Sequence, residues 1–498
     1  MTGRLTSTLT PRTARVVFGA DADAAIEGEL PYVTTVDQAH VVMLAERGLI
    51  GTAAASGLLA EIESLRANGF APLRGRVAPR GVYLLYEAYL IDRLGVDVGG
   101  VLHTGRSRND LKATTHLLRM RDTAAAVLGE LLRLQAVLLG RARANRAVVM
   151  PAYSQFQASV PTTYGHYLLG VAMALDTDIR GLVQAGQGLA RCPLGAAGGA
   201  GTDVPIDPGR TAALLGFTES VDHAGYAIAA RDTLVRMLSS AVLAGLTLSR
   251  LSTDLQLWST REFDLVGFPD DLVGSSSAMP QKRNPFLLEH VKGGAGALIG
   301  AWTAAVTTMK NTPFGNSVEV TTDAVTPVWA GMDTLRDIVA LSTAVVAGAV
   351  PRPGRMLRSA QAGFTVATAL ANRLAGQGVP FRSAHTAVGG LVTELIAEGV
   401  ESFAEPAAAD LARRLSSRLG TEVVLTADDL DPVAVAAATT AGGGPSPASF
   451  AAAHERLTGS WRAHVLDLSR AVASGRAADE RRQSAVRAAV ATTLRSRS

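Results

Sequence analysis

The stretch LKATTHLLRMRDTAAAVLGELLRLQAVLLGRARANRAV, Leu111–Val148, decides the fold. It is rich in Ala, Leu and Arg, it contains no proline, and its apolar residues recur at the spacing of an α-helix. A helix of about 35 residues is roughly three times as long as the ~12-residue mean of globular proteins. Because helices of such length are typical of bundles, the stretch predicts an all-α protein built around a bundle of long helices.

Working outward, further segments have the same character, with Gly or Pro near their ends, namely Leu234–Leu257, Gly293–Met309 and Val328–Val350. Strands do not alternate with helices along the chain, which argues against a doubly wound sheet. Shifts in composition predict an N-terminal domain over 1–110, a central long-helix bundle over 111–350 and a small helical C-terminal domain over 351–498. The Arg- and Ala-rich tail, Arg470–Ser498, predicts a solvated amphipathic helix.

Composition excludes several classes of protein. A hydrophobic share of 48% with 18% charged residues is typical of a folded protein and not of a disordered one. The 47 basic and 44 acidic residues give a formal net charge of +3, too small over this much surface for a nucleic-acid-binding footprint. The single cysteine, Cys192, excludes an intramolecular disulfide and a Cys-rich zinc site and is typical of a reducing compartment.

The sequence also predicts a protein that neither crosses nor enters a membrane. Residues 1–15 lack the apolar core of a signal peptide. Of two uncharged stretches, Val148–Leu175 is too polar to lie in lipid, and Gly293–Met309 is shorter than the ~18–20 apolar residues that a span requires. We therefore expect a cytoplasmic location.

Three segments carry groups suited to chemistry, and the most distinctive is GSSSAMPQKRNP, Gly274–Pro285. Its serines, glycine and two prolines are incompatible with a helix. A mobile loop with hydroxyls beside a lysine and an amide is suited to covering an anionic substrate and stabilising developing negative charge. On composition alone, a plain Ser/Gly linker is equally compatible.

The second segment, HTGRSRND, His103–Asp110, directly precedes the longest predicted helix. Asn109 or Asp110 is expected to cap that helix. Arg106 and Arg108 beside a helix N-terminus predict an anion-binding cluster, since guanidinium pairs bidentately with carboxylate and the helix dipole adds to the attraction. A solvated turn with two surface arginines is an equally good interpretation of this segment alone.

The third segment, PAYSQFQASVP, Pro151–Pro161, places polar side chains within an otherwise uncharged region. Buried polar side chains need hydrogen-bond partners, and functional sites are one place where they find them. Taken alone, this segment is interpreted more readily as a polar cluster satisfied within the core.

Together, the three segments resemble the fumarase/aspartase superfamily, and HTGRSRND narrows the resemblance to its argininosuccinate lyase branch. The similarity continues through LSTDLQLWSTREF, Leu251–Phe263, and ATALANRLAGQGVPFRSAH, Ala367–His385, so that it covers most of residues 100–390. It implies a three-domain, mostly helical homotetramer whose active sites each combine segments from different subunits. It further implies elimination from a substituted succinate with release of fumarate, no metal or organic cofactor, and neither nucleic-acid nor membrane partners.

The resemblance also implies roles for single residues. Ser276 matches the loop serine that removes the proton from the succinyl carbon, with Ser277 as the second candidate because the glycine before it is shifted by one place. Lys282 and Asn284 match residues that stabilise the carbanion, and Glu289 matches the acidic residue that orients a catalytic histidine. The implied substrate-binding residues are Thr104, Ser107, Arg108, Asn109, Ser154, Gln157, Ser277, Met279, Asn316 and Thr321; Arg108, Asn109 and Ser154 match positions that hold the succinyl carboxylates.

The sequence departs from the family at the general acid, where Gln155 stands in place of a histidine. Glutamine neither gives up nor takes a proton near pH 7. His166 does not replace it, because eleven helical residues place it about 16 Å further along an axis. His103 or His290 of a neighbouring subunit are the remaining candidates.

A second departure concerns the residues that hold the arginine arm of argininosuccinate. The family's tyrosine, glutamine and lysine correspond here to Asn316, Thr321 and Ala324, and Asn311–Asp323 contains neither Tyr nor Gln. The loss of three arm contacts argues against a housekeeping argininosuccinate lyase.

Three functions remain compatible with the sequence. The first is a lyase of specialised metabolism that acts on another substituted succinate, such as an N-succinyl amine or nitrosuccinate. The second is argininosuccinate lyase itself, in arginine biosynthesis, with different acid catalysis. The third is a non-catalytic structural tetramer. The retained Ser276, Lys282, Asn284 and Arg108 favour the first, because a leaving group that departs as a stable anion needs no general acid and Gln155 can simply hydrogen-bond to it.

Overall fold

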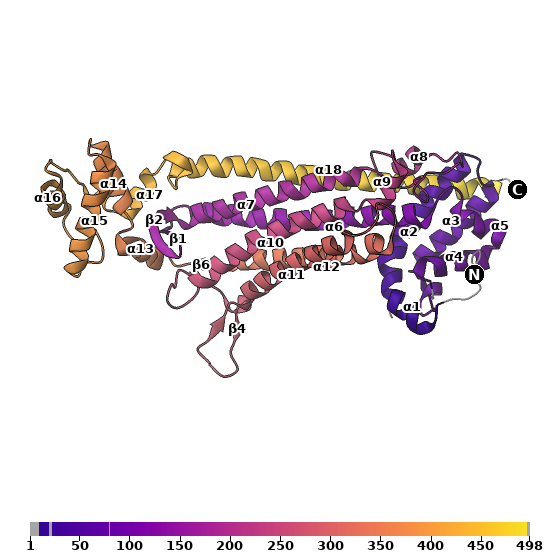
Figure 1. Ribbon diagram of the computed structural model, residues 1–498, viewed down its shortest axis with the longest axis horizontal. Coiled ribbons are helices and arrows are strands. Elements are labelled where there is room, and N and C mark those ends of the chain that lie inside the picture. The colour runs from indigo at the N-terminus through magenta and orange to yellow at the C-terminus, as the bar shows by residue number, and fades with distance from the viewer. Residues whose placement is uncertain (1–8, 19–21, 79, 496–498) are drawn as a thin grey trace.

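The structure is a computed structural model that describes residues 9–18, 22–78 and 80–495. The described part is elongated and mostly helical, with one group of helices at each end and a bundle of long helices between them (Figure 1). The predicted all-α fold with a bundle of long helices is confirmed. The division at residues 110 and 350 stays a prediction.

The central bundle consists of long helices that run side by side (Figure 1). They are α6 (Arg108–Ala144), α7 (Tyr164–Ala185), α10 (Asp232–Trp258), α11 (Phe286–Met309) and α12 (Thr326–Gly348). Their facing sides form one apolar core in which Leu131, Leu238 and Leu335 are fully buried. The length of α6 follows from its sequence, because neither a proline nor a run of β-branched residues interrupts it.

Two described helices, α6 and α10, are long and apolar enough to cross a membrane by length and composition alone. In each, 44% of the most apolar window is buried inside the molecule, and core helices of bundles pass the same test. Neither is one of the two uncharged stretches that the sequence singled out. The cytoplasmic location stays a prediction.

A second group of helices forms the N-terminal end. They are α1 (Pro11–Phe18), α2 (Ala22–Glu46), α3 (Thr52–Ala67), α4 (Val82–Leu94), α5 (Val96–Gly99), α8 (Pro208–Leu214) and α9 (Ala224–Ala229). Their apolar core joins distant parts of the chain, since Ile62, Leu214 and Val486 are all buried in it. The end that holds the start of α6 is therefore a packed unit and not a loose extension.

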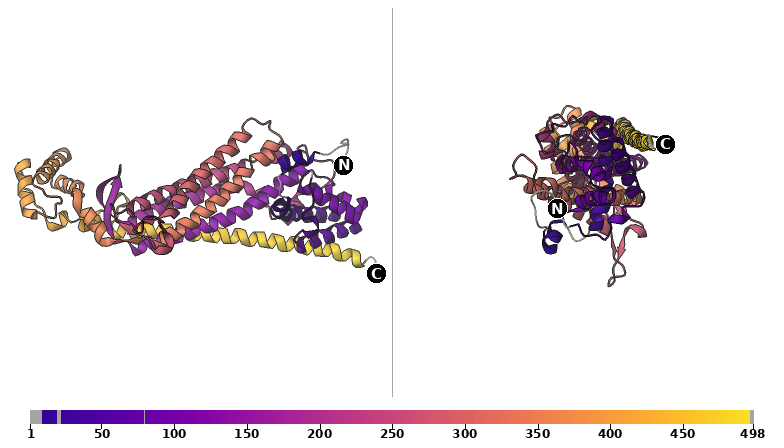
Figure 2. Two further views of the ribbon diagram at one scale, coloured as in Figure 1. Left: turned by 90° about the horizontal axis from the view of Figure 1, so that it is seen from below. Right: turned by 90° about the vertical axis from the view of Figure 1, so that its right-hand side faces the viewer.

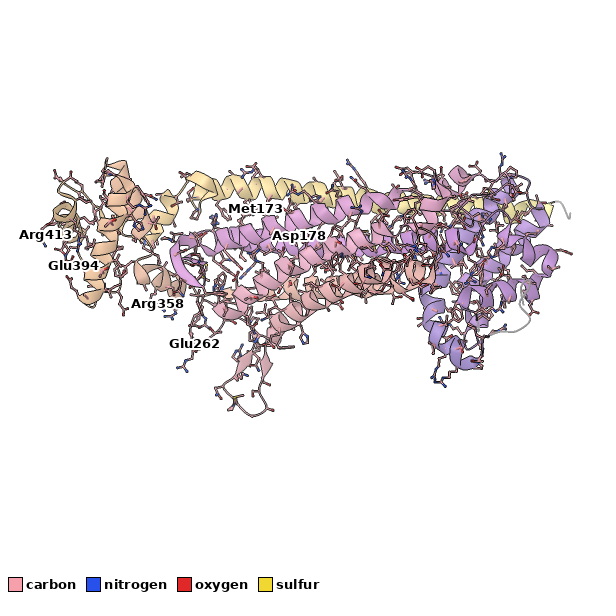
Figure 3. The ribbon with its side chains drawn as sticks, in the orientation of Figure 1. Met173, Asp178, Glu262, Arg358, Glu394 and Arg413 are labelled. Atoms are coloured by element: carbon pink, nitrogen blue, oxygen red, sulfur yellow. The ribbon has the colours of Figure 1, made fainter. Side chains whose placement is uncertain are left out.

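The opposite end consists of α13 (Pro353–Gln361), α14 (Ala367–Gly376), α15 (Phe381–Ala397), α16 (Ala408–Leu419) and α17 (Pro432–Ala438). It has its own apolar core, which includes Leu370, Leu391 and Leu411. Glu394, on the surface of this end (Figure 3), accepts a hydrogen bond from Arg414 at 2.9 Å.

The described strands form three short antiparallel pairs. The pairs are β1 (Val149–Ser154) with β2 (Gln157–Thr163), β3 (Val266–Gly267) with β6 (Val350–Pro351), and β4 (Gly274–Ser275) with β5 (Arg283–Asn284). Two of the three segments singled out in the sequence are thus hairpins. In the first pair, Ser154 faces Gln157 and the chain turns through Gln155 and Phe156, both with positive φ.

The last helix, α18 (Pro447–Arg495), begins at the end formed by α13–α17 and runs along the whole bundle to the end formed by the N-terminal helices (Figures 1 and 2). Trp461 donates a hydrogen bond to the carbonyl of Leu132 in α6 at 2.9 Å, and Arg482 donates one to the Gln38 amide oxygen in α2 at 3.2 Å. The prediction of a helix over the described part of the tail is confirmed. The prediction that this tail is solvated is wrong for Arg482 and Val486, which are buried.

Candidate active site

A cavity of about 1310 Å³ lies at the N-terminus of α6. Arg108, Asn109 and Lys112 of α6 line it, facing the segment that connects α11 to α12. Because Arg108 and Lys112 are four residues apart on one helix, their side chains lie on the same face. Two cations at a helix N-terminus form a site suited to carboxylates.

The start of α6 is fixed by Ser107, which is the N-cap. Its hydroxyl accepts a hydrogen bond from the Asn109 amide at 3.2 Å, and the Asp110 carboxylate accepts one from the Ser107 amide at 3.0 Å. The prediction that Asn109 or Asp110 caps the helix is therefore wrong: Asp110 is the distal member of a capping box. This arrangement makes Arg108 the first helical residue, with its side chain exposed.

Arg106 does not belong to an anion-binding cluster, contrary to the prediction. Its guanidinium is fully buried, with Nη1 2.6 Å from Oδ1 of Asp37, which is also fully buried. The Asp37 carboxylate raises the pKa of Arg106, so the guanidinium stays charged and is neutralised inside the protein. Of the two arginines in the motif, Arg108 alone is free for an anionic ligand.

Arg108 contacts a network of polar side chains that joins Tyr83, His103 and Glu87. The Arg108 guanidinium lies 5.5 Å from the centre of the Tyr83 ring, a cation–π contact. The Tyr83 hydroxyl lies 2.7 Å from Nε2 of His103, and a Glu87 carboxylate oxygen lies 3.2 Å from the same nitrogen. Burial, together with the charges of Arg106 and Arg108, lowers the pKa of His103 to about 4. His103 is therefore neutral at pH 7 and holds no imidazolium proton to donate.

The side of the cavity opposite α6 comes from the segment after α11. Asn316 is exposed there, whereas Thr321 is buried and its hydroxyl donates a hydrogen bond to the Ser317 carbonyl at 2.8 Å. Lys112 donates a hydrogen bond to the Thr322 hydroxyl at 2.6 Å, which joins the two sides. Thr104, expected to contact substrate, donates its hydroxyl hydrogen to the Val101 carbonyl at 2.8 Å.

Sequence reasoning missed Tyr83 and Lys112. Lys112 carried a usable signal, since it lies one helical turn after Arg108 on the expected helix. Tyr83 carried none, because its contact with Arg108 depends on how α4 packs beside the start of α6.

The third segment, Pro151–Pro161, lies at the far end of the bundle, in the β1–β2 hairpin (Figure 1). Ser154, Gln155 and Gln157 are all exposed at its tip. Positive φ at both turn residues, 51° at Gln155 and 61° at Phe156, matches the tight turn that connects two antiparallel strands. The interpretation of this segment as a satisfied core cluster is therefore wrong, because its polar groups face outward.

The Ser-rich segment, Gly274–Pro285, projects from the bundle as the β4–β5 hairpin (Figure 1). The Ser276 hydroxyl accepts a hydrogen bond from the Met279 amide at 3.1 Å, so Ser276 begins the turn. Ser277, Met279 and Lys282 are exposed, and Asn284 on β5 is half-buried. The segment is thus a protruding hairpin with accessible hydroxyl and ammonium groups.

Glu289 lies in the first turn of α11, just after this hairpin. It accepts a hydrogen bond from the Gln256 amide at 3.0 Å, and Lys292 donates one to the other end of the same amide. Among the described residues of this chain, the polar partner of Glu289 is thus an amide and not the expected histidine. His290 packs edge-on against Phe286.

The three segments of one chain lie far apart. At about 1.5 Å per residue, the 37 residues of α6 alone separate Arg108 from the β1–β2 hairpin by about 55 Å. The β4–β5 hairpin points away from both (Figure 1). One chain therefore does not bring its own three segments together.

Comparison with known families supports one lineage over most of the chain. Residues 77–300 match the family described as Lyase, and residues 364–436 match the family described as Argininosuccinate lyase C-terminal. The argininosuccinate lyase of Methanoculleus marisnigri is 36% identical over 423 residues, which cover 84% of this chain and 84% of that protein. The argininosuccinate lyase of Pseudomonas aeruginosa is 36% identical over 386 residues, covering 77% of this chain and 82% of that protein.

The comparison with solved structures agrees over nearly the whole length. EDDS lyase, crystallised in complex with formate, has a TM-score of 0.86 and 27% sequence identity, and the match covers 99% of this chain and 98% of that one. A variant of EDDS lyase with bound fumarate matches equally well, with a TM-score of 0.86.

Proposed function

Because the chain belongs to the argininosuccinate lyase family of the fumarase/aspartase superfamily, and is therefore a carbon–nitrogen lyase, we propose that it releases fumarate from a substituted succinate other than argininosuccinate. The observation that carries the proposal is Gln155. It lies exposed at the tip of the β1–β2 hairpin, at the position that matches the general-acid histidine of the family, and an amide has no proton to transfer near pH 7.

The elimination starts at the β4–β5 hairpin. Ser276 acts as its alkoxide, after its hydroxyl proton has passed to solvent, and takes a proton from the carbon next to a carboxylate, so that the C–H bond breaks, the hydroxyl is re-formed and the electron pair forms the C=C bond of fumarate. The bond from the neighbouring carbon to nitrogen breaks in turn, and its electron pair leaves with the departing group. Between the breaking of the C–H bond and that of the C–N bond, negative charge builds up on the carboxylate next to the deprotonated carbon. Lys282 and Asn284 stabilise this charge.

Arg108 is the group best suited to hold the substrate. It is exposed at the N-terminus of α6, where its charge, the helix dipole and the nearby Lys112 all favour a carboxylate. A succinyl compound carries two carboxylates, and neither arginine-arm contact nor general acid is needed to bind them. Ser107 and Asn109 add hydrogen-bonding groups beside them.

The leaving group follows from what Gln155 is able to do. An amine needs a proton as its bond to carbon breaks, whereas nitrite departs as a stable anion and needs only a hydrogen-bond donor. The Gln155 amide supplies such a donor. Nitrosuccinate, which yields fumarate, nitrite and the proton held by Ser276, is therefore the preferred member of the proposed substrate class.

The proposal includes a homotetramer whose active sites take one segment from each of several subunits. The separation of about 55 Å along α6 prevents one chain from bringing its own segments together. Large apolar side chains are also exposed on the bundle, with Leu243 on α10 57% exposed and Ile299 on α11 42% exposed. Met173 on α7 is exposed as well (Figure 3). Apolar surface of this kind is typical of subunit interfaces.

The test follows the ultraviolet absorbance of fumarate with purified protein and a panel of argininosuccinate, adenylosuccinate, aspartate, nitrosuccinate and hydrazinosuccinate. We expect a signal from nitrosuccinate and none from argininosuccinate. Argininosuccinate cleaved faster than every other compound would contradict the proposal. Silence across the whole panel, from a protein that is folded and tetrameric, would favour a structural tetramer over an enzyme of this substrate class.

A further inference from the structure

A second cavity, of about 840 Å³, lies between α18 and the helices α2, α6 and α7. It shares no lining residue with the cavity at the start of α6. Along α6, Lys112 and Thr115 line the first cavity, whereas Leu118 and Asp122 line the second. The second cavity is therefore a separate space on the same helix.

The cavity exists because α18 does not pack against the bundle over part of its length. Every residue from Ser469 to Arg476 is exposed, although a packed helix buries a residue every three or four positions. On either side, the hydrogen bonds of Trp461 to Leu132 and of Arg482 to Gln38 hold α18 to the bundle. The opening thus lies between two fixed points.

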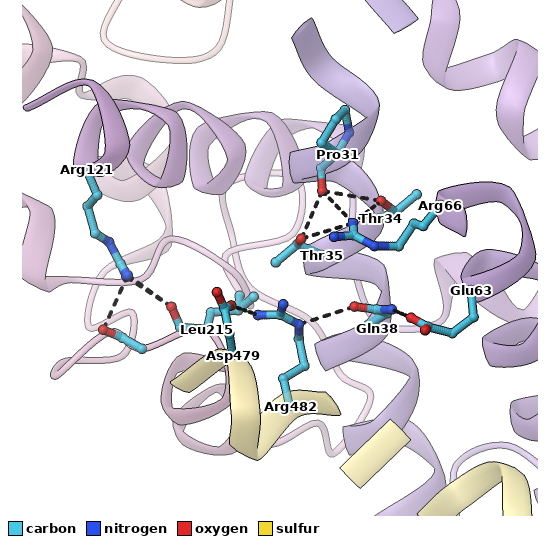
Figure 4. Close-up of polar contacts among 11 residues, drawn as sticks. Pro31, Thr34, Thr35, Gln38, Glu63, Arg66, Arg121, Leu215, Asp479 and Arg482 are labelled. Carbon is cyan, nitrogen blue, oxygen red and sulfur yellow. Dashed lines mark hydrogen bonds and ion pairs between the residues drawn. The ribbon is translucent and has the colours of Figure 1, made fainter. Parts of the chain in front are cut away.

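Two arginines meet at one end of this cavity (Figure 4). Arg66 donates hydrogen bonds to the Pro31 carbonyl at 2.8 Å and to the Thr34 hydroxyl at 2.6 Å, both neutral acceptors. Within the described residues, no ion pair joins Arg66 to a carboxylate. Arg482, whose side chain is 5% exposed, pairs with Asp479 at 2.6 Å. Burial and the charge of Arg482 lower the pKa of Arg66, as expected for two like charges in a poorly solvated space.

A third arginine adds to the positive charge. Arg121 donates hydrogen bonds to the carbonyls of Leu215 at 3.0 Å and of Gly216 at 3.3 Å (Figure 4), and it lies 4.0 Å from the centre of the Phe217 ring. Its Nε is buried without a hydrogen-bond partner among the described residues. Burial lowers the pKa of Arg121 too. Buried cations with neutral partners are costly, and an anion that enters the cavity removes part of that cost.

Four carboxylates also line the cavity, and each already has a partner: Glu27 pairs with Arg74, Asp122 accepts a hydrogen bond from Tyr32, Asp467 pairs with Arg470, and Asp479 pairs with Arg482. The apolar part of the wall is formed by Leu118, Leu128, Leu132, Ile179, Leu182 and Leu468. An ion such as phosphate would leave this surface in contact with water, and fumarate has no apolar body to cover it. A ligand that matches both the arginines and the apolar wall has one anionic group and an extended apolar body.

We propose that this cavity binds a small amphiphilic carboxylate, with its carboxylate between Arg66 and Arg482 and its apolar body along the leucine-rich wall. Guanidinium is suited to this head group because it pairs bidentately with carboxylate. The proposal is independent of the proposed lyase reaction, since none of the residues assigned to that reaction lines the cavity.

The test is calorimetric titration of the full-length oligomer with decanoate as the probe. We expect one decanoate per chain, and we expect 1-decanol, which has the same body without the charge, to bind about tenfold more weakly or worse. Arg66→Gln is expected to weaken decanoate binding by about tenfold. Arg133→Gln is the matched control, because Arg133 lies on α6, is exposed and does not line the cavity.

A second variant keeps the test decisive if Arg66→Gln fails to fold. Ala125→Trp fills the cavity from α6 and is expected to abolish decanoate binding, and an unchanged circular dichroism spectrum and oligomer size show that the variant is folded. Decanoate that does not bind, or that binds Arg66→Gln as tightly as the parent protein, would overturn the proposal. Inorganic phosphate bound as tightly as decanoate would overturn it as well, because the apolar wall would then contribute nothing.

Discussion

The ionisation of His103 is one contribution to the pH dependence of stability, alongside those of the buried His40 and His116, whose pKa values are also lowered by burial. Burial and two neighbouring arginines lower the pKa of His103 to about 4 in the folded chain, from 6.5 in an unfolded one. Between these values the unfolded chain binds a proton that the folded chain does not. The contribution of His103 to stability is therefore fully present above pH 6.5 and is lost as the pH falls toward 4.

The size of the loss follows from the two pKa values. At pH 5 the unfolded ring is mostly protonated and the folded ring mostly neutral, which costs about 2 kcal/mol of the free energy of unfolding. The His103 side chain is 29% exposed, so solvent screens only part of the effect. We expect His103→Gln to lack this loss, because glutamine keeps a hydrogen-bonding group near Tyr83 and does not titrate.

The measurement is urea unfolding of the parent protein and of His103→Gln at pH 7 and at pH 5, at equal protein concentration. The difference between the two unfolding free energies is expected to shift by about 2 kcal/mol in favour of the variant at the lower pH. A difference that does not change with pH would refute the reasoning, because His103 would then bind its proton equally in both states. An imidazolium would in that case be available near neutral pH, and His103 of a neighbouring subunit would again be a candidate general acid.

Further predictions address the proposed chemistry and the buried ion pair. Ser276→Ala is expected to lower the rate of fumarate release by about 10²–10⁴-fold while size-exclusion chromatography shows an unchanged oligomer. Ser277→Ala is expected to lower the rate less, and a larger loss in Ser277→Ala than in Ser276→Ala would exclude Ser276 as the base. Gln155→His is expected to raise the rate, measured by fumarate absorbance, only for a substrate whose leaving group is an amine, so a gain with nitrosuccinate would contradict the assignment of an anionic leaving group. Asp37→Asn is expected to lower the free energy of unfolding by about 3–5 kcal/mol, because it leaves the buried charge of Arg106 without its partner. The double variant Asp37→Leu/Arg106→Met is expected to recover most of that loss in the same urea titration, and its failure to do so would show that the ion pair itself supplies the stability.

The helical architecture could be predicted from the sequence because it depends on the spacing of apolar residues within single segments. The long run from Leu111 has the helical period over ten turns or so, and no other regular structure accommodates it. The start of the helix was predicted less well, since Ser107, Asn109 and Asp110 are all good capping residues and only the backbone geometry selects Ser107.

The contacts within the candidate site could not be predicted from local sequence patterns, because they join residues on separate helices. Arg106 and Arg108 look equivalent in the motif, yet one is buried against Asp37 and the other is exposed. Asp37 lies on α2, far earlier in the chain, and no short-range pattern pairs it with Arg106. The cation–π contact of Arg108 with Tyr83 has the same origin, because it depends on how separate helices pack.

The return of α18 to the N-terminal end has a consequence for biosynthesis. Val486 is part of the apolar core of that end, and Ser56 donates a hydrogen bond to the Val490 carbonyl at 3.3 Å. A ribosome makes the N-terminal end first and α18 last, and domains generally begin to fold in that order. The first core to be synthesised thus waits for almost the last residues of the chain before it closes. We therefore expect a nascent chain that stops short of Val486 to leave apolar surface of this core exposed and to be more prone to aggregation than the full-length chain.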